Sequence, residues 1–122
     1  MSANLAKYVL PLDGTLLDAI EAIKNNRSRC VILMSGDRVA GVLSEGDIMS
    51  ALLQNTDVHA HIGEYVRHNF KFLAERDLSK ALKLMRDFGL TLVPVVDREL
   101  HLIDVITLNE LLKNVTLDPR GE

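Results

Sequence analysis

Gly41-Val-Leu-Ser44-Glu-Gly-Asp47-Ile48 is the stretch of this sequence that decides the fold. Its apolar first half predicts the end of a strand. A serine followed three residues later by an acid, ahead of further apolar residues, predicts the start of a helix. The same layout returns 63 residues later, at Asp104-Val-Ile-Thr107-Leu-Asn-Glu110. A strand-to-helix corner that occurs twice indicates an internal duplication.

The predicted elements on either side of these corners also form matching pairs. A shift of 62 residues superimposes the apolar stripe Leu16, Ala19, Ile20 and Ile23 on Leu78, Ala81, Leu82 and Met85. The i, i+3, i+4, i+7 spacing of both stripes is typical of a helix with one buried face. Each copy therefore reads as β-α-β-β-α, and we place the first copy in residues 1–57 and the second in residues 58–122.

The sequence predicts the following strands and helices in the two copies. In the first copy they are a strand at 7–10, a helix at 15–25, strands at 29–34 and 39–43, and a helix at 45–54. In the second they are a strand at 70–73, a helix at 78–88 that Gly89 ends with a left-handed cap, strands at 91–96 and 101–106, and a helix at 108–114. A lone copy of about 55 residues can cover only one face of its sheet. Two copies are expected to stack their uncovered faces about a pseudo-two-fold axis, as an α/β (α+β) unit with two related clefts.

Composition and charge exclude several classes of protein. The 14 Lys+Arg and 17 Asp+Glu give a net charge of −3, which offers no basic stripe for nucleic acid. The arginines of the second half, Arg67, Arg76, Arg86 and Arg98, are interleaved with acids and predict a solvated surface. No apolar run approaches the roughly 20 residues that span a bilayer. The single cysteine, Cys30, excludes an internal disulfide and fits a reducing compartment, so we expect a cytoplasmic protein without a membrane segment.

Ser44 and Asp47 have two interpretations that do not exclude one another. In the first, the Ser44 hydroxyl and the free amides behind it hold an anion, while the Asp47 carboxylate accepts from the paired hydroxyls of a ribose. Gly41 would let the backbone approach such a ligand. In the second interpretation, Ser44 and Asp47 form a capping box that only stabilises the helix start, as Thr15 and Asp18 also can.

Catalytic and metal-binding patterns are not found in the sequence. His59, His61 and His68 match no structural zinc spacing and are interpreted as solvated histidines. Cys30 lies in an apolar predicted strand, where a buried and inert thiol is expected. No Gly-rich phosphate loop or nucleophile elbow is present, so we expect a protein that is not an enzyme and has no metal site.

The duplicated unit, together with Val93-Pro-Val-Val-Asp97 and Gly41-Val-Leu-Ser44-Glu-Gly-Asp47, resembles the tandem CBS-domain pair, or Bateman module. The resemblance covers roughly residues 7–115. Such modules bind adenosyl compounds (AMP, ADP or ATP, and in some members S-adenosylmethionine or NAD) in the clefts between the copies. They regulate an attached or associated protein. The resemblance therefore implies a regulatory adenine-nucleotide-binding module with an effector that the sequence does not identify.

The resemblance also implies roles for individual residues. Ser44 would contact phosphate and Asp47 the ribose hydroxyls. The start of the preceding strand, Arg29 to Val31, would line the base, and Arg29 would reach a phosphate. In the second copy, Asp104 stands where glycine is expected and Glu110 replaces the aspartate after Thr107, which adds repulsion toward phosphate. We therefore expect the cleft built on Thr107 and Glu110 to be empty or weak.

The last helix of each copy is apolar on more than one side, which predicts a partner as well as an internal contact. CBS pairs assemble into flat dimers through such helices, so the resemblance implies a homodimer. An alternative function follows from the same helices. In that hypothesis the chain is a homodimeric interaction scaffold that binds no small molecule.

Overall fold

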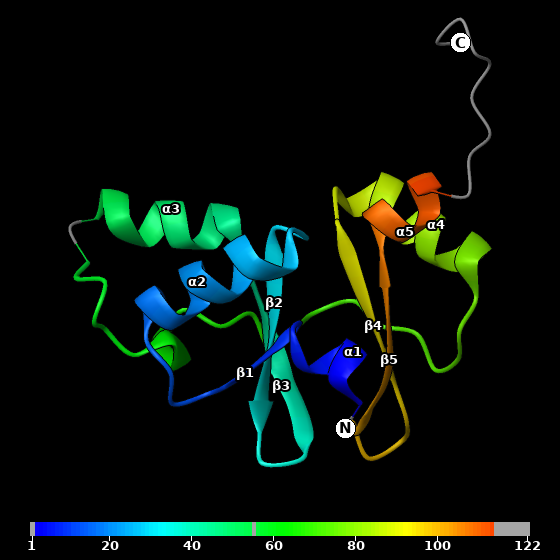
Figure 1. Ribbon diagram of the computed structural model, residues 1–122, viewed down its shortest axis with the longest axis horizontal. Helices are drawn as coiled ribbons and strands as arrows, with labels where there is room; N and C mark the ends of the chain where they lie inside the picture. Colours follow the sequence, from blue (N-terminus) through cyan, green and yellow to red (C-terminus); the bar gives the residue numbers. More distant parts are fainter. Residues whose placement is uncertain (1, 55, 114–122) are drawn as a thin grey trace, which may run out of the picture.

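The computed structural model describes residues 2–54 and 56–113, in two halves that lie side by side (Figure 1). The first half contains α1 (Ala3–Ala6), β1 (Val9–Pro11), α2 (Leu16–Asn26), β2 (Cys30–Ser35), β3 (Arg38–Ser44) and α3 (Glu45–Leu53). The second half contains η1 (Ile62–Glu64), α4 (Leu78–Phe88), β4 (Leu92–Val96), β5 (Leu102–Thr107) and α5 (Leu108–Lys113). The α/β (α+β) class is confirmed. The short α1 and η1 were not predicted, and the predicted last residue of the final helix, position 114, lies outside the described residues.

The strand pairing places the two corner residues at equivalent points. In the first sheet β1 runs parallel to β2, and β2 is antiparallel to β3 with Cys30 opposite Ser44. In the second sheet β4 is antiparallel to β5 with Leu92 opposite Thr107. Ser44 and Thr107 are therefore each the last residue of a strand, directly before a helix.

The second copy lacks the predicted strand at 70–73. Leu73 alone forms a bridge to β4, donating its amide to Pro94 O and accepting from the Val96 amide. In the first copy, the Ile32 amide of β2 extends the pairing by donating to Tyr8 O. Pro94 has no amide hydrogen for such a bond. The second sheet therefore has two strands, where the sequence predicted three.

The helix ends follow local sequence signals. Thr15 caps α2 in a capping box, in which the Asp18 amide donates to Thr15 Oγ1 and Asp18 Oδ2 accepts from the Thr15 amide. Gly89 ends α4 with a φ of 66°, and Arg27 ends α2 with a φ of 59°. The left-handed cap predicted at Gly89 is confirmed, and a non-glycine residue adopts the same conformation in the first copy.

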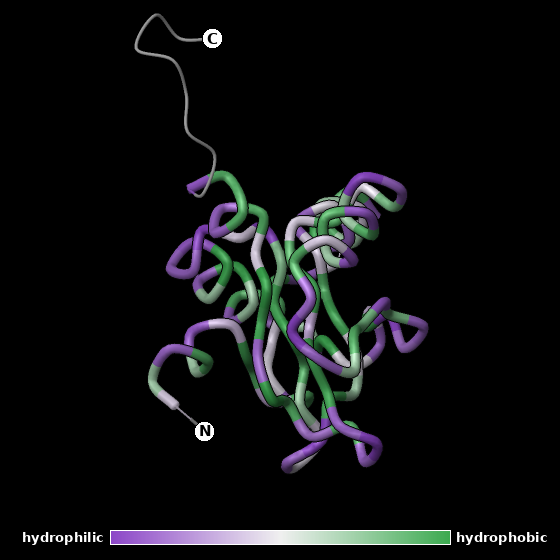
Figure 2. Tube along the Cα trace, turned by 90° about the vertical axis from the view of Figure 1, so that its right-hand side faces the viewer, coloured by the Kyte–Doolittle hydropathy of each residue, from purple (hydrophilic) through white to green (hydrophobic). Residues whose placement is uncertain are grey.

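Alternating side chains of β2 build two separate cores. Val31 and Leu33 pack toward α2 and α3, in one cluster with Leu16, Ala19 and Ile48. The alternate residues of β2, Cys30, Ile32 and Met34, face the other sheet. They form a central cluster with residues of β4 and β5, among them Leu92, Val96 and Val105. In Figure 2 the apolar segments of the strands run through the middle of the molecule. The prediction that the copies stack their uncovered sheet faces is confirmed. Among the described residues, no helix is long and apolar enough to cross a membrane.

Candidate functional site

The corner between β3 and α3 contains the capping box that the sequence predicted. Ser44 Oγ accepts from the Asp47 amide at 3.1 Å, and Asp47 Oδ2 accepts from the Ser44 amide and from Ser44 Oγ, both at 2.9 Å. The Glu45 amide donates to Arg29 O. Two of the first three amides of α3 are therefore already bonded within the protein, which reduces the number that an anion can use.

The same corner also faces a cavity between the two copies. Ser44 and Asp47 line a hollow of about 290 Å³ together with Cys30 and Val42 of the first sheet. The second copy closes it with Lys71 and with residues 88–92, which contain the exposed ring of Phe88 and the buried Leu92. The capping interpretation and the cleft interpretation of Ser44 and Asp47 are thus compatible in this geometry.

Arg67 closes one side of this cavity. Its Nε lies 2.7 Å from Asp47 Oδ1, and the Arg67 side chain is 66% exposed whereas that of Asp47 is 11% exposed. Burial alone raises the pKa of the Asp47 carboxyl. Hydrogen bonds from Ser44 and Arg67 outweigh this effect and lower the pKa below its ordinary value. Asp47 is therefore a carboxylate at neutral pH.

Gly41 makes room for the connector, which is the segment at residues 64–69 that leads from the first sheet toward the second. The Val42 amide donates to Arg67 O at 3.2 Å, and the Arg67 amide donates to Val42 O at 3.0 Å. A Cβ on Gly41 would lie 2.4 Å from Arg67 O and 2.6 Å from Val66 Cγ2. The space that the glycine leaves is filled by residues 66–67, and Gly41 does not line the cavity.

Arg29 and Val31 also lie outside this cavity. Val31 is fully buried in the core beneath α2 and α3, because its side chain points to the opposite face of β2 from Cys30. Arg29 lines a separate hollow with Ser28 and Thr91. Of the residues that the sequence assigned to this cleft, the structure places Ser44 and Asp47 on the cavity, whereas Arg29, Val31 and Gly41 do not line it.

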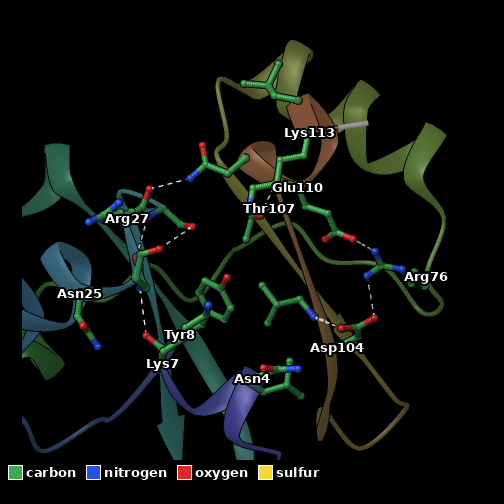
Figure 3. A pocket seen from close by; sticks show the side chains of 16 residues that line it. Asn4, Lys7, Tyr8, Asn25, Arg27, Arg76, Asp104, Thr107, Glu110 and Lys113 are labelled. Carbon is green, nitrogen blue, oxygen red and sulfur yellow. Dashed lines mark hydrogen bonds and ion pairs between the residues drawn. The ribbon is translucent and has the colours of Figure 1, made fainter. Parts of the chain in front are cut away.

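The corner between β5 and α5 is built differently. Thr107 Oγ1 accepts from the Glu110 amide at 3.1 Å, while Glu110 forms an ion pair with Arg76. Arg76 also contacts Asp104 Oδ2 at 2.9 Å, so one guanidinium compensates both carboxylates (Figure 3). These residues line a larger hollow of about 720 Å³. The repulsion expected from Asp104 and Glu110 is thus offset by a cation that the sequence pattern did not assign to them.

Sequence reasoning missed charged residues of both clefts, among them Arg67 and Arg76. Both are partly exposed, at 66% and 40% of the side chain, as expected for a solvated surface. Their partners lie 20 or more positions away in the sequence, at Asp47, Asp104 and Glu110. No local motif marks these ion pairs, since they form only where the folded chain brings distant segments together.

The Cys30 thiol is buried, and two of the histidines contact backbone oxygens. Burial raises the pKa of the Cys30 thiol to about 12, and the charge of Asp47 adds to the effect, which leaves the thiol protonated at neutral pH. His61 and His68 each place Nδ1 near a backbone oxygen, that of Asp13 at 3.2 Å and that of Ala40 at 2.9 Å. Within the described residues, three potential metal-ligating groups come together elsewhere, at Asp97, Glu99 and His101.

A family model for the CBS domain matches this chain twice, at residues 1–54 and 62–116. The chain belongs to the CBS domain family. Each match contains one strand-to-helix corner, Ser44 in the first and Thr107 in the second. The resemblance to a tandem CBS pair is therefore confirmed.

Other known proteins are similar to this chain in sequence or in fold. An uncharacterised 17.7 kDa protein of Acidianus ambivalens is 25% identical over 113 residues, which are 91% of this chain and 68% of the relative. A CBS domain protein of Pyrobaculum aerophilum complexed with AMP has a TM-score of 0.72 at 24% identity, covering 84% of this chain and 81% of that one. The cytosolic domain of the Mg²⁺ channel MgtE in complex with ATP has a TM-score of 0.68 at 20% identity, covering 89% and 45%. These structures show that the fold is shared.

Proposed function

We propose that this CBS pair is a non-catalytic regulatory module that binds an adenine nucleotide in the cavity beside Ser44 and Asp47. One observation carries the proposal: the two corner residues line a cavity whose walls come from both copies. The complexes of similar folds with AMP and with ATP support the choice of ligand class. The free, buried thiol of Cys30 supports a cytoplasmic location.

The chemistry of the cavity matches the parts of a nucleotide. Cys30, Val42 and Leu92 offer an apolar wall for a base. The Asp47 carboxylate is an acceptor for ribose hydroxyls, and Arg67 and Lys71 offer two cations for phosphate. A volume of about 290 Å³ lies at the lower end for small-molecule sites, which favours a mononucleotide such as AMP over NAD. We propose the cleft beside Thr107 and Glu110 as the weaker site, because two carboxylates, Asp104 and Glu110, share the one guanidinium of Arg76 there and leave more negative charge near a phosphate than Asp47 does.

Regulation would follow from the position of the cavity. A ligand that contacts Asp47 of the first copy and Leu92 of the second stabilises one relative orientation of the copies. The shift cannot exceed the difference in the ligand's affinity for the two orientations. We propose that an effector protein or an attached domain reads this orientation.

A homodimer is the second proposal, and it also serves the alternative function of a ligand-free scaffold. The side chains of Met49 and Leu53 on α3 are 56% and 83% exposed. They adjoin an apolar groove of about 350 Å³ between α2 and α3, which Ile20, Ile48 and Leu52 help to line. Exposed apolar surface beside an apolar groove on one face favours contact with a second copy through α3.

Thermal melting with AMP, ADP, ATP, S-adenosylmethionine and NAD in turn tests the nucleotide proposal. A ligand at about 100 times its Kd adds about 2.7 kcal/mol of stability. We expect one adenine nucleotide to raise the melting temperature, and Asp47→Ala to abolish the rise. Asp18→Ala is the matched control, because Asp18 occupies the same capping position in α2 away from the cavity.

The outcomes separate the two functions. If none of the five compounds raises the melting temperature, the scaffold function is favoured over nucleotide binding. If Glu110→Ala reduces the shift as much as Asp47→Ala does, the proposed ranking of the two clefts is wrong.

A further inference from the structure

We infer that Arg67 is an internal competitor for the ribose subsite, so that the Ser44 cavity selects anionic nucleotides over uncharged nucleosides. The inference rests on the proposed function and specifies which ligands of the adenosyl class can bind.

Asp47 has few acceptor positions left. An ionised carboxylate offers about four lone-pair sites. Three are used within the protein: Oδ2 accepts from the Ser44 amide and from Ser44 Oγ, and Oδ1 accepts from Arg67 Nε. The two adjacent hydroxyls of a ribose need two acceptor positions. A ribose must therefore displace one of the three donors before Asp47 can receive both hydroxyls.

Arg67 is the donor whose departure frees Oδ1, the carboxylate oxygen that the capping box of α3 does not use. Ser44 is tied to Asp47 by the capping box that begins α3. The backbone of Arg67 is held by two hydrogen bonds to Val42, whereas its side chain is 66% exposed and contacts Asp47 only through Nε. Displacement thus moves the guanidinium, while the connector stays in place against Gly41.

The displaced guanidinium exchanges its carboxylate partner for water unless the ligand supplies an anion. Among the described residues that line the cavity, the second cation is Lys71, whose Nζ lies 4.4 Å from the centroid of the Phe88 ring. An uncharged nucleoside would leave Arg67 without a carboxylate and supply nothing in return. A nucleotide phosphate offers Arg67 a bidentate anion in exchange for Asp47. The resident ion pair therefore penalises nucleosides and spares nucleotides.

The second corner lacks this property. Arg76 contacts both Asp104 and Glu110, so a ribose that displaced it from Glu110 would leave it paired with Asp104. Arg76 therefore keeps a carboxylate partner whether or not the ligand carries a phosphate. Selection by charge is expected at the Ser44 cavity alone.

Isothermal titration calorimetry with AMP and with adenosine tests the inference on the wild-type chain, on Arg67→Ala and on Arg86→Ala. Arg86 is the matched control, because it is an exposed arginine with an acidic neighbour, Asp87, and lies outside the cavity. Removing Arg67 should tighten adenosine binding about two- to five-fold, the range that an exposed ion pair supplies. It should weaken AMP binding roughly ten-fold through the lost phosphate partner. Arg86→Ala should change neither affinity.

Each result has a distinct meaning. If AMP binds the wild type but Arg67→Ala leaves the ratio of AMP to adenosine affinity unchanged, Arg67 is not a competitor and the proposed function stands. If neither compound binds the wild type or Arg67→Ala, both the inference and the proposed function are wrong. Arg67→Gln, which keeps an N–H donor at the position of Nε without the charge, should repeat the result of Arg67→Ala. A Gln variant that retains wild-type discrimination would overturn the role of the charge.

Discussion

His101 Nε2 of the second copy lies 3.2 Å from Asp37 Oδ2 of the first. The two residues come from the two hairpin turns, which lie at the same end of the molecule (Figure 1). His101 Nδ1 lies 2.9 Å from Asp97 Oδ2. A neutral imidazole has one N–H, so only the imidazolium can donate to carboxylates at both ring nitrogens. The protonated ring therefore joins the two copies at this end.

The His101 contact predicts a pH-dependent stability. The hydrogen bond to Asp97 raises the pKa of His101 above its ordinary value of 6.5, partial desolvation opposes the rise, and the charges of Asp97 and Asp37 add to it. A raised pKa in the folded state stabilises the fold fully below about pH 6.5, and the contribution is lost as the pH rises through the folded pKa. Partial burial raises the pKa of Asp97, but hydrogen bonds from the His101 amide and ring lower it overall below its ordinary value of 3.8. The Asp97 contribution is therefore present above that value and is lost as the pH falls through the lowered pKa.

Urea unfolding at pH 5.5 and at pH 8.5 checks this prediction with His101→Gln. The substitution should lower the free energy of unfolding more at pH 5.5 than at pH 8.5. Two further charged residues lie close to His101: Glu99, which is grouped with Asp97 and His101, and Arg38, which forms an isolated β-bridge with His101. Because salt screens exposed charges, added salt should reduce the difference between the losses at the two pH values. His59→Gln, at an exposed histidine, is the control. Equal losses at both pH values would contradict the role of the imidazolium.

Gly41→Ala is predicted to destabilise the fold. The added Cβ would meet the carbonyl oxygen of Arg67 at 2.4 Å, and the Arg67 backbone, which is held by two hydrogen bonds to Val42, cannot move aside cheaply. We expect a loss of about 1–3 kcal/mol, as for other overpacked sites. Gly46→Ala is the matched control, since its Cβ would meet no atom closer than 3.7 Å and lies inside α3. Gly46→Ala should leave the midpoint of urea unfolding unchanged or raise it.

Asn26→Ala is predicted to lose a buried hydrogen-bond network. The Asn26 side chain is buried, donates to Cys30 O at 3.0 Å and to Lys7 O at 3.3 Å, and accepts from the Ser28 amide at 2.7 Å. Truncation leaves those backbone groups without partners, which costs about 1–3 kcal/mol in the free energy of unfolding. Asn25→Ala, at the exposed neighbour in α2, should have no such cost. Similar midpoints of urea unfolding for the two variants would show that the network contributes little.

Leu53→Lys is predicted to dissociate the proposed homodimer. A side chain that is 83% exposed in the isolated chain contributes little to its folding, so the change should leave monomer stability unaltered. Sedimentation equilibrium should show a dimer for the wild type and a monomer for Leu53→Lys. Ile103→Lys is the control, since Ile103 is 54% exposed on β5 and lies away from α3. A wild type that is monomeric at all concentrations would exclude the homodimer.

Local signals account for the elements that sequence analysis placed well. The start of α2 is defined by Thr15 and Asp18, and the end of α4 by Gly89, within a few residues of each position. The spacing of Leu16, Ala19 and Ile23 identified the face of α2 that is buried. The strand predicted at 70–73 failed for a non-local reason, since its pairing depends on Pro94, some 20 residues away.

The sequence alone determined the duplication and the strand-to-helix corners at Ser44 and Thr107, because periodic and capping patterns act over a few residues. It also determined the stacking of the two sheets, because each copy is too short to cover both faces of its own sheet. The tertiary structure decided which charges meet at the corners. Arg67 reaches Asp47 because the connector is bonded to Val42 across the space left by Gly41, and Arg76 reaches Asp104 and Glu110 from another segment. Ion pairs between exposed side chains have no sequence period, so they follow only from the path of the folded chain.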